Sequence, residues 1–274
     1  MSATEASYDR WADAYRDWWA PVIAPWAIRL LDRLEMLDLA DRPATLVDIG
    51  TGSGTLALAA LRRWPGVRAI GVDPARRLLE MAEDGARGAG MLDRLTTRVG
   101  EAARLPLPDA AADVAVSSFV LQLTPSRAAA VREAFRVLRP GGAFAHLTWR
   151  WDETPWELED AFDDALDALR IEPPSRPGGG VDRSYSSPEV AAAELRVAGF
   201  RSVRAREEWM EHRFTPRSYL DVAEHWTEDD TFATLDEPVR RRLRAEVLRR
   251  LERLPDDALV WRRPLVSVVG HRPA

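Results

Sequence analysis

The stretch Leu46-Val47-Asp48-Ile49-Gly50-Thr51-Gly52-Ser53-Gly54 decides the fold of this 274-residue chain. An apolar run ends next to an acidic residue, glycines follow at every second position, and an alanine-rich helical pattern comes next. This order predicts a buried strand, a tight turn and a helix. Glycine has no Cβ atom and adopts positive φ at little cost, so a ligand can approach such a turn closely. The first N–H groups of the following helix then face that ligand.

The pattern around this turn alternates between strands and helices. Strands are predicted at residues 45–49, 68–72, 95–99, 113–117 and 143–149. The helices between them are predicted at residues 55–63, 74–88 and 127–138. Strand and helix units of about 30 residues imply right-handed crossovers and a doubly wound parallel sheet, which is an α/β fold.

The N-terminal residues precede this alternation. Apolar and aromatic residues recur at helical spacing over residues 3–20, and Pro21 is expected to end that helix. A second helix is predicted at about residues 25–37. We weigh two roles for this extension: a brace packed against the sheet, or a lid whose aromatic side chains cover a ligand at the glycine turn.

The pattern changes after residue 150. A helix with acidic faces is predicted at 151–170, followed by a Pro/Gly-rich loop at 173–180. Ser187, Pro188 and Gly199 bound a further helix by their capping preferences. The remaining elements are strands at 203–213 and 265–270 with helices at 217–226 and 238–254. The long segment between those strands is assigned to a helical cap at about 215–256.

Composition excludes several classes of protein. The chain has no cysteine, so it forms no disulfide and offers no thiolate nucleophile or Cys-type zinc site. It also has no lysine, and we expect no metal site. No apolar run is long enough for a membrane span, and the N-terminal residues do not resemble a secretion signal, so we expect a cytoplasmic protein. A net charge of -6 argues against a nucleic-acid partner.

Three acidic residues surround the glycine turn. Asp48 precedes it, Asp73 ends the second strand and Glu101 follows the third. The dinucleotide fingerprint Gly-x-Gly-x-x-Gly fits poorly, because its last position is Thr55, and carboxylates repel a pyrophosphate. They suit a ligand with hydroxyl and amine donors and a positive charge. S-adenosylmethionine carries all of these groups, together with a sulfonium that aromatic rings can stabilise.

These residues resemble the class I S-adenosylmethionine-dependent methyltransferases, in particular the small-molecule branch of ubiquinone/menaquinone-biosynthesis methyltransferases. The matching segments cover most of residues 45–150: they are residues 47–54, 71–74, 100–106, 113–121 and 136–142. The resemblance implies a Rossmann-like seven-stranded sheet of order 3-2-1-4-5-7-6 with the last strand antiparallel. Together with the pattern along the chain, it divides the sequence into an N-terminal helical extension or lid (1–43), an S-adenosylmethionine-binding core (44–150), an insertion (151–186) and the rest of the sheet with its cap (187–274).

The resemblance implies a role for each matching position. Asp48 lies near the amino group of the cofactor, and Gly50, Thr51 and Gly52 hold its methionine part. Asp73 binds the ribose, Pro74 and Ala102 contact the adenine faces, and Glu101 takes the adenine amine. The backbone of Ser117 contacts the methionine part. The family often has Asp in place of Glu101, and His where this chain has Gln122-Leu123, so a base at that place is in doubt.

The acceptor side of the cleft should lie beyond the fourth and fifth strands. Aromatic residues predicted to line it are Trp149, Trp156, Tyr185 and Trp226, which suggests a small apolar or aromatic substrate. Candidate bases by residue type are His146, His212 and His225. The leading hypothesis is a small-molecule methyltransferase. The alternatives are an S-adenosylmethionine-binding enzyme that catalyses a cyclisation or rearrangement without methyl transfer, a nicotinamide oxidoreductase and a non-enzymatic binding protein.

Overall fold

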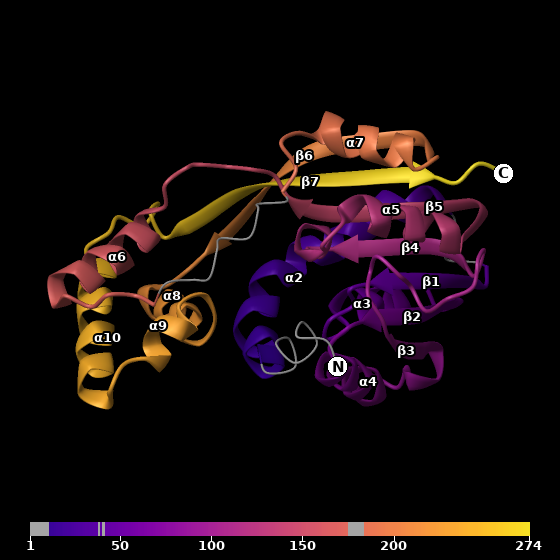
Figure 1. Cartoon of the computed structure of the whole chain (residues 1–274). Helices are drawn as coiled ribbons and strands as arrows, with labels where there is room; N and C mark the ends of the chain where they lie inside the picture. Colours follow the sequence, from indigo (N-terminus) through magenta and orange to yellow (C-terminus); the bar gives the residue numbers. More distant parts are fainter. Residues whose placement is uncertain (1–10, 38, 40–41, 175–183) are drawn as a thin grey trace.

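Seven strands form a single sheet in the computed structural model, which describes residues 11–37, 39, 42–174 and 184–274. The strands are β1 (Ala44–Ile49), β2 (Val67–Asp73), β3 (Leu95–Val99), β4 (Ala112–Ser118), β5 (Leu138–Trp149), β6 (Arg201–Arg213) and β7 (Val260–His271). Their order is β3-β2-β1-β4-β5-β7-β6, and β7 runs antiparallel to both neighbours (Figure 1). The predicted fold class and strand order are confirmed.

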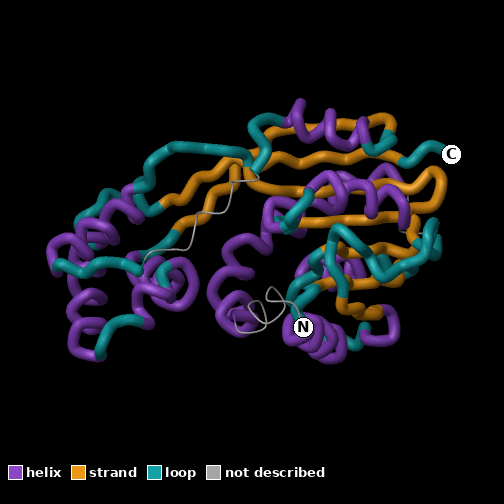
Figure 2. Tube along the Cα trace, viewed as in Figure 1, coloured by secondary structure: helices purple, strands orange, loops and turns teal. Residues whose placement is uncertain are grey.

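Helices cover both faces of the sheet (Figure 2). On one face lie α2 (Ala20–Arg29), η2 (Leu30–Leu37) and α3 (Thr55–Arg63), with α4 (Arg76–Gly88) beside β2 and β3. On the other lie α5 (Arg127–Val137) and α7 (Pro188–Val197). Successive strand residues point to opposite faces, so Leu46 and Val47 belong to different cores. Both faces of the central strands are therefore buried, as continuous apolar runs predict, whereas the edge strands β3 and β6 are largely exposed.

The outer half of β6 and β7 extends beyond the sheet as a two-stranded arm. Pairing of β5 with β7 ends at Trp149 and Leu265, whereas β6 and β7 stay paired as far as Arg213 and Val260. The predicted last strand began only at residue 265, because Pro264 and two arginines interrupt the apolar alternation before it. The arm leads to a cap formed by α6 (Glu157–Leu169), α8 (Pro216–Val222), η5 (Ala223–Thr227), α9 (Asp229–Ala233) and α10 (Glu237–Leu251) (Figure 1).

The prediction that Pro21 ends the first helix is wrong. Helical backbone runs from residue 11 through α2, although Pro21 and Pro25 both lie in it. A π-helical turn, η1 (Tyr15–Trp19), directly precedes α2. Proline lacks an N–H group, and its ring crowds the carbonyl four residues earlier, so a wider turn at that point lets the helix continue. The part of the prediction that covers residues 3–10 lies outside the described residues.

Within the described residues, no helix is both long enough and apolar enough to cross a membrane.

Candidate functional site

The glycine turn adopts a backbone that other residues avoid. Gly50, Gly52 and Gly54 all have positive φ, at 73°, 54° and 86°. A Cβ atom on Gly50 would lie 2.3 Å from Cγ2 of Val120, and one on Gly54 would lie 2.8 Å from Cβ of Ala82. Glycine is therefore required at these two positions both by conformation and by space.

Asp48 holds the turn from below. Its side chain is only 1% exposed, and Oδ2 accepts hydrogen bonds from Thr51 Oγ1 at 2.8 Å and Ala57 N at 3.1 Å. Ala57 is the third residue of α3, whose N-cap Gly54 has no side chain to offer, so Asp48 supplies the helix cap. Burial, with a smaller effect of nearby Asp73, raises the pKa of Asp48 to about 7 against the effect of these hydrogen bonds.

Asp73 holds the turn from the side. It ends β2 and is 7% exposed. Oδ2 accepts from Gly52 N and Oδ1 accepts from Ala75 N, both at 2.9 Å. One carboxylate thus ties the glycine turn after β1 to the residue that precedes α4.

A cavity of about 270 Å³ lies against this turn. The residues at the ends of the first three strands that line it are Gly50, Gly52, Asp73, Pro74, Gly100, Glu101 and Ala102. The segment after β4 provides a second wall, which is Ser118, Phe119, Val120, Gln122, Leu123, Thr124 and Pro125. The remaining wall is mainly aromatic and includes Trp11, Tyr15, Trp19, Trp149 and Trp226.

Two helical elements from opposite parts of the chain cover the cavity. Tyr15 lies over the turn, since a Cβ on Gly52 would be 3.5 Å from its ring. Its ring centroid is 5.6 Å from that of Trp226 in η5, and Trp18 stacks on His225 at 4.6 Å. Burial and then the charges of Asp73 and Asp48 raise the pKa of Tyr15, so its phenol stays protonated at neutral pH.

The wall after β4 contains residues that sequence reasoning missed. Phe119 adopts a positive φ of 56°, uncommon for a residue with a side chain, and its ring lies 4.7 Å from that of Trp149. Gln122 donates to the carbonyl of Phe119 at 2.8 Å and accepts from Thr148. The one signal in the sequence was Gln122-Leu123 at the position where the family often has histidine.

Eight of the sequence-predicted residues line the cavity: Gly50, Gly52, Asp73, Pro74, Glu101, Ala102, Trp149 and Trp226. The side chains of Asp48 and Thr51 are buried and are not part of the lining. Ser117 is fully buried, and its hydroxyl donates to the carbonyl of Ile49 at 2.9 Å, so it joins β4 to β1. Its neighbour Ser118 faces the cavity in its place.

Other sequence-predicted residues lie elsewhere in the fold, which corrects the expectation that they share one site. His146 is fully buried on the α5 and α7 face, because it is three residues from Trp149 and strand side chains alternate. Tyr185 is buried on that same side, with the guanidinium of Arg127 3.8 Å above its ring. These two side chains pack in the core rather than reaching the cavity.

Three more candidates lie on the arm and the cap. His212 lies on the outer part of β6, 4.4 Å from the ring of Phe214. Trp156 packs inside the cap against Tyr219 and is 8% exposed. His225 contacts the carbonyl of Asp221 through Nδ1 at 2.8 Å. It precedes the lining residue Trp226 in the sequence, and no other histidine candidate is as close in sequence to a residue of the lining.

No group of three or more His, Cys, Asp or Glu side chains is arranged to hold a metal ion in the part of the chain that the structure describes.

Comparison with known proteins identifies the family. Residues 47–146 match a family model described as a methyltransferase domain. A malonyl-[acyl-carrier protein] O-methyltransferase of Geobacter sulfurreducens is 35% identical over 185 residues, which are 66% of this chain and 65% of the relative. A 27-O-demethylrifamycin SV methyltransferase of Amycolatopsis mediterranei is 34% identical over 201 residues, or 72% and 68%. The chain therefore belongs to the class I S-adenosylmethionine-dependent methyltransferases and is an enzyme of that class.

Further comparisons agree with this family. A ubiquinone/menaquinone biosynthesis C-methyltransferase of Dinoroseobacter shibae is 29% identical over 72% of this chain and 74% of the relative. The crystal structure of the [4+2]-cyclase SpnF has a TM-score of 0.63 at 19% identity and covers 99% of this chain and 96% of that one. At that identity the likeness concerns the fold alone. The chain spans just under two thirds of the Geobacter relative.

We predict that Asp48→Asn changes the pH dependence of stability. Because the folded pKa of Asp48 is raised, its contribution is complete below the ordinary carboxyl pKa of about 3.9 and is lost as pH rises through about 7. Asparagine keeps an oxygen for Thr51 and Ala57 but does not titrate. Between pH 4 and 7 the free energy of unfolding of the wild type should fall relative to the variant, by at most about 1.4 kcal/mol per pH unit. Urea unfolding at several pH values measures it, and parallel pH profiles would contradict it.

His146→Leu should act in the opposite direction. Burial, helped by the charge of Arg127, lowers the pKa of His146 to about 3, and both ring nitrogens are buried without a partner in the described part of the chain. A depressed histidine pKa means that stability is lost as pH falls from about 6.5 towards 3. The variant should therefore gain stability over the wild type as pH falls, by at most about 1.4 kcal/mol per unit. A constant difference across pH 4 to 7.5 in urea unfolding would refute the assignment.

Proposed function

We propose that the cavity at the glycine turn binds S-adenosylmethionine and that the enzyme transfers its methyl group to a small, apolar or aromatic acceptor. The observation that carries the proposal is the convergence of Gly50, Gly52, Asp73 and Glu101 on one cavity at the carboxyl ends of β1, β2 and β3. In an open α/β sheet this is the edge at which ligands bind.

The lining residues suit the chemical groups of the cofactor. The glycines expose backbone without Cβ atoms, which leaves room for the methionine part. Asp73 offers two carboxylate oxygens at the cavity, each a charged acceptor, which suits a ribose hydroxyl pair. Pro74 and Ala102 offer small apolar surfaces to an adenine, and Glu101 is an acceptor for its amine.

When bound, the cofactor supplies an electrophilic methyl group on a sulfonium. The protein's own part is to orient the reactants and exclude water, and holding two reactants in line can supply much of a transfer rate. Tyr15, Trp19 and Trp226 close over the turn and provide aromatic faces that favour a cation. The carboxylate of Asp73 adds negative charge below it.

The acceptor side is formed by Phe119, Leu123 and the neighbouring tryptophans, which favours an apolar or aromatic acceptor. No histidine is present among the described residues that line the cavity, and Tyr15 stays protonated. An acceptor atom that is already deprotonated or uncharged at neutral pH fits this lining best. The names of the relatives include both O- and C-methyltransferases, so they do not choose the acceptor atom.

The same lack of a histidine in the described lining favours a second candidate, in which the cofactor is bound but a cyclisation or rearrangement occurs without methyl transfer. The likeness to the [4+2]-cyclase extends over nearly the whole of both chains, which is consistent with this candidate at the level of fold.

Cofactor binding can be measured directly. Isothermal titration calorimetry should detect binding of S-adenosylmethionine and of S-adenosylhomocysteine to the wild type. Asp73→Ala should weaken both at least about tenfold, because it removes a charged acceptor and frees Gly52 N from its anchor. Asp257→Ala, an exposed acidic residue outside the cavity lining, serves as the matched control and should bind as the wild type does. Folded wild-type protein that binds neither compound would exclude the proposal.

Methyl transfer itself is tested with cofactor labelled in the methyl group. Incubation with a panel of phenolic, quinone-like and carboxylate acceptors should place the label in a product, with one S-adenosylhomocysteine formed per product. A product that forms from such a substrate in the presence of cofactor without any label, and without S-adenosylhomocysteine, would establish the second candidate in place of the first.

A further inference from the structure

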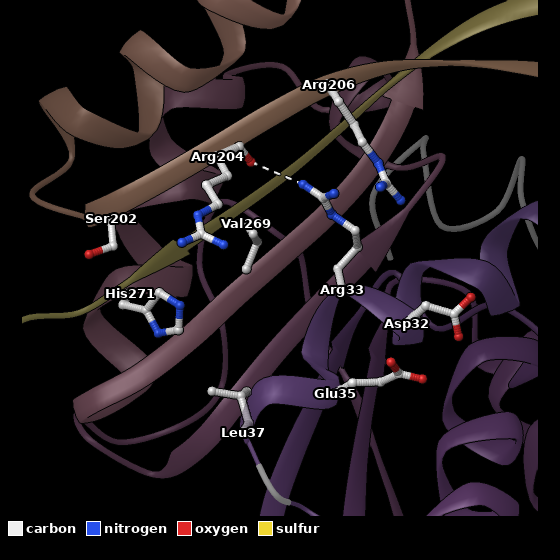
Figure 3. Close-up of a pocket in the computed structure, with 9 residues that line it drawn as sticks. All are labelled: Asp32, Arg33, Glu35, Leu37, Ser202, Arg204, Arg206, Val269 and His271. Carbon is white, nitrogen blue, oxygen red and sulfur yellow. Dashed lines mark hydrogen bonds between the residues drawn. The ribbon is translucent and has the colours of Figure 1, made fainter.

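A second cavity, of about 650 Å³, lies between the N-terminal extension and the sheet edge formed by β6 and β7 (Figure 3). It shares no lining residue with the cavity at the glycine turn. The residues that line it from η2 are Asp32, Arg33, Glu35 and Leu37, and those from β6 and β7 are Ser202, Arg204, Arg206, Val269 and His271. Four of these nine side chains can carry a positive charge.

The carboxylates at this cavity are already paired. Asp32 and Glu35 form ion pairs with Arg63 of α3 at 2.6 and 2.5 Å, and Arg63 is outside the lining. Figure 3 shows both carboxylates to one side of the arginines, on the η2 wall. Two carboxylates thus share one guanidinium, and neither forms an ion pair with Arg33, Arg204 or Arg206 in the described part of the chain.

Two guanidinium groups in the cavity lack a carboxylate partner in the described part of the chain. Arg33 extends from η2 towards β6, and its Nη2 donates to the carbonyl of Arg204 at 3.3 Å, while its Nε is buried without a partner among the described residues (Figure 3). The guanidinium of Arg204 lies between Arg33 and His271 in the same view. Arg206 differs, since it pairs with Glu208 at 3.1 Å.

The positive groups influence one another. Burial lowers the pKa of Arg33, and the charges of Arg206 and Arg204 lower it further, while Glu208 opposes them. Burial followed by the charge of Arg204 lowers the pKa of His271. Like charges held close together cost free energy, Glu208 offsets only part of that cost at Arg33, and a bound anion would offset more of it.

We propose that this second cavity binds a small organic phosphate, with Arg33 and Arg204 holding its phosphate group. The planar guanidinium fork matches phosphate oxygens in two parallel hydrogen bonds. The cavity volume falls within the range of small-molecule sites and exceeds the needs of a phosphate group alone. Leu37 and Val269 give the organic part an apolar wall. This site goes beyond the proposed methyl transfer and does not depend on it.

The experiment uses the full chain and inorganic pyrophosphate as the probe, at constant ionic strength set with sodium chloride. Calorimetry should detect pyrophosphate binding to the wild type. Arg204→Gln and Arg33→Gln should each weaken it at least about tenfold. Arg62→Gln, an exposed arginine on α3 outside both cavities, is the matched control and should leave it unchanged.

Three further measurements keep the test specific. Citrate, a carboxylate of comparable charge, should bind more weakly than pyrophosphate, and tighter binding of citrate would overturn the phosphate assignment. Asp73→Ala should retain pyrophosphate binding, which separates this site from the glycine turn. Arg204→Gln should keep wild-type circular dichroism and S-adenosylhomocysteine binding.

Wild-type protein that does not bind pyrophosphate, or equal binding by all three arginine variants, would show that Arg204 and Arg206 merely protect an edge strand by their charge.

Discussion

Two buried carboxylates hold the glycine turn, and the geometry of the cavity depends on them. Asp48 connects the end of β1 to Thr51 and to the first turn of α3, and Asp73 connects the turn to the start of α4. Both accept hydrogen bonds from the backbone of the elements that they join, and burial raises the pKa of Asp48 to about 7. Two acidic side chains thus lie where the backbone is most open, and a cationic ligand bound there would favour their charged forms.

Closure of the cavity depends on segments that are distant in sequence. η1 lies near the start of the described residues and η5 lies in the cap, yet Tyr15, Trp18 and Trp19 meet His225 and Trp226 across the opening. Both segments are π-helical turns. Such turns are rare in proteins overall, and many of those that occur lie at functional sites. The long arm of β6 and β7 positions η5, because the cap lies at the end of this arm (Figure 1). The cap lies on the same side of the sheet as α2.

One helical run connects two cavities of opposite chemistry. Its first part, through η1 and α2, covers an acidic and aromatic cavity, and its last part, η2, lines a cavity rich in arginine. The N-terminal extension is therefore more than a brace against the sheet.

The sequence by itself determined the alternating strands and the turn, and the strand order followed from the resemblance to a known family. Apolar runs and the glycine, proline and acidic residues at strand ends are local signals, and Gly50, Asp73 and Glu101 could be placed from those signals alone. Tertiary structure alone decided which aromatic residues reach the cavity. Trp149 reaches it and His146 does not, since alternation along β5 turns them to opposite faces. Arg33 and Arg204 are 171 residues apart and are brought together only when η2 packs against the sheet, a contact that no local pattern encodes.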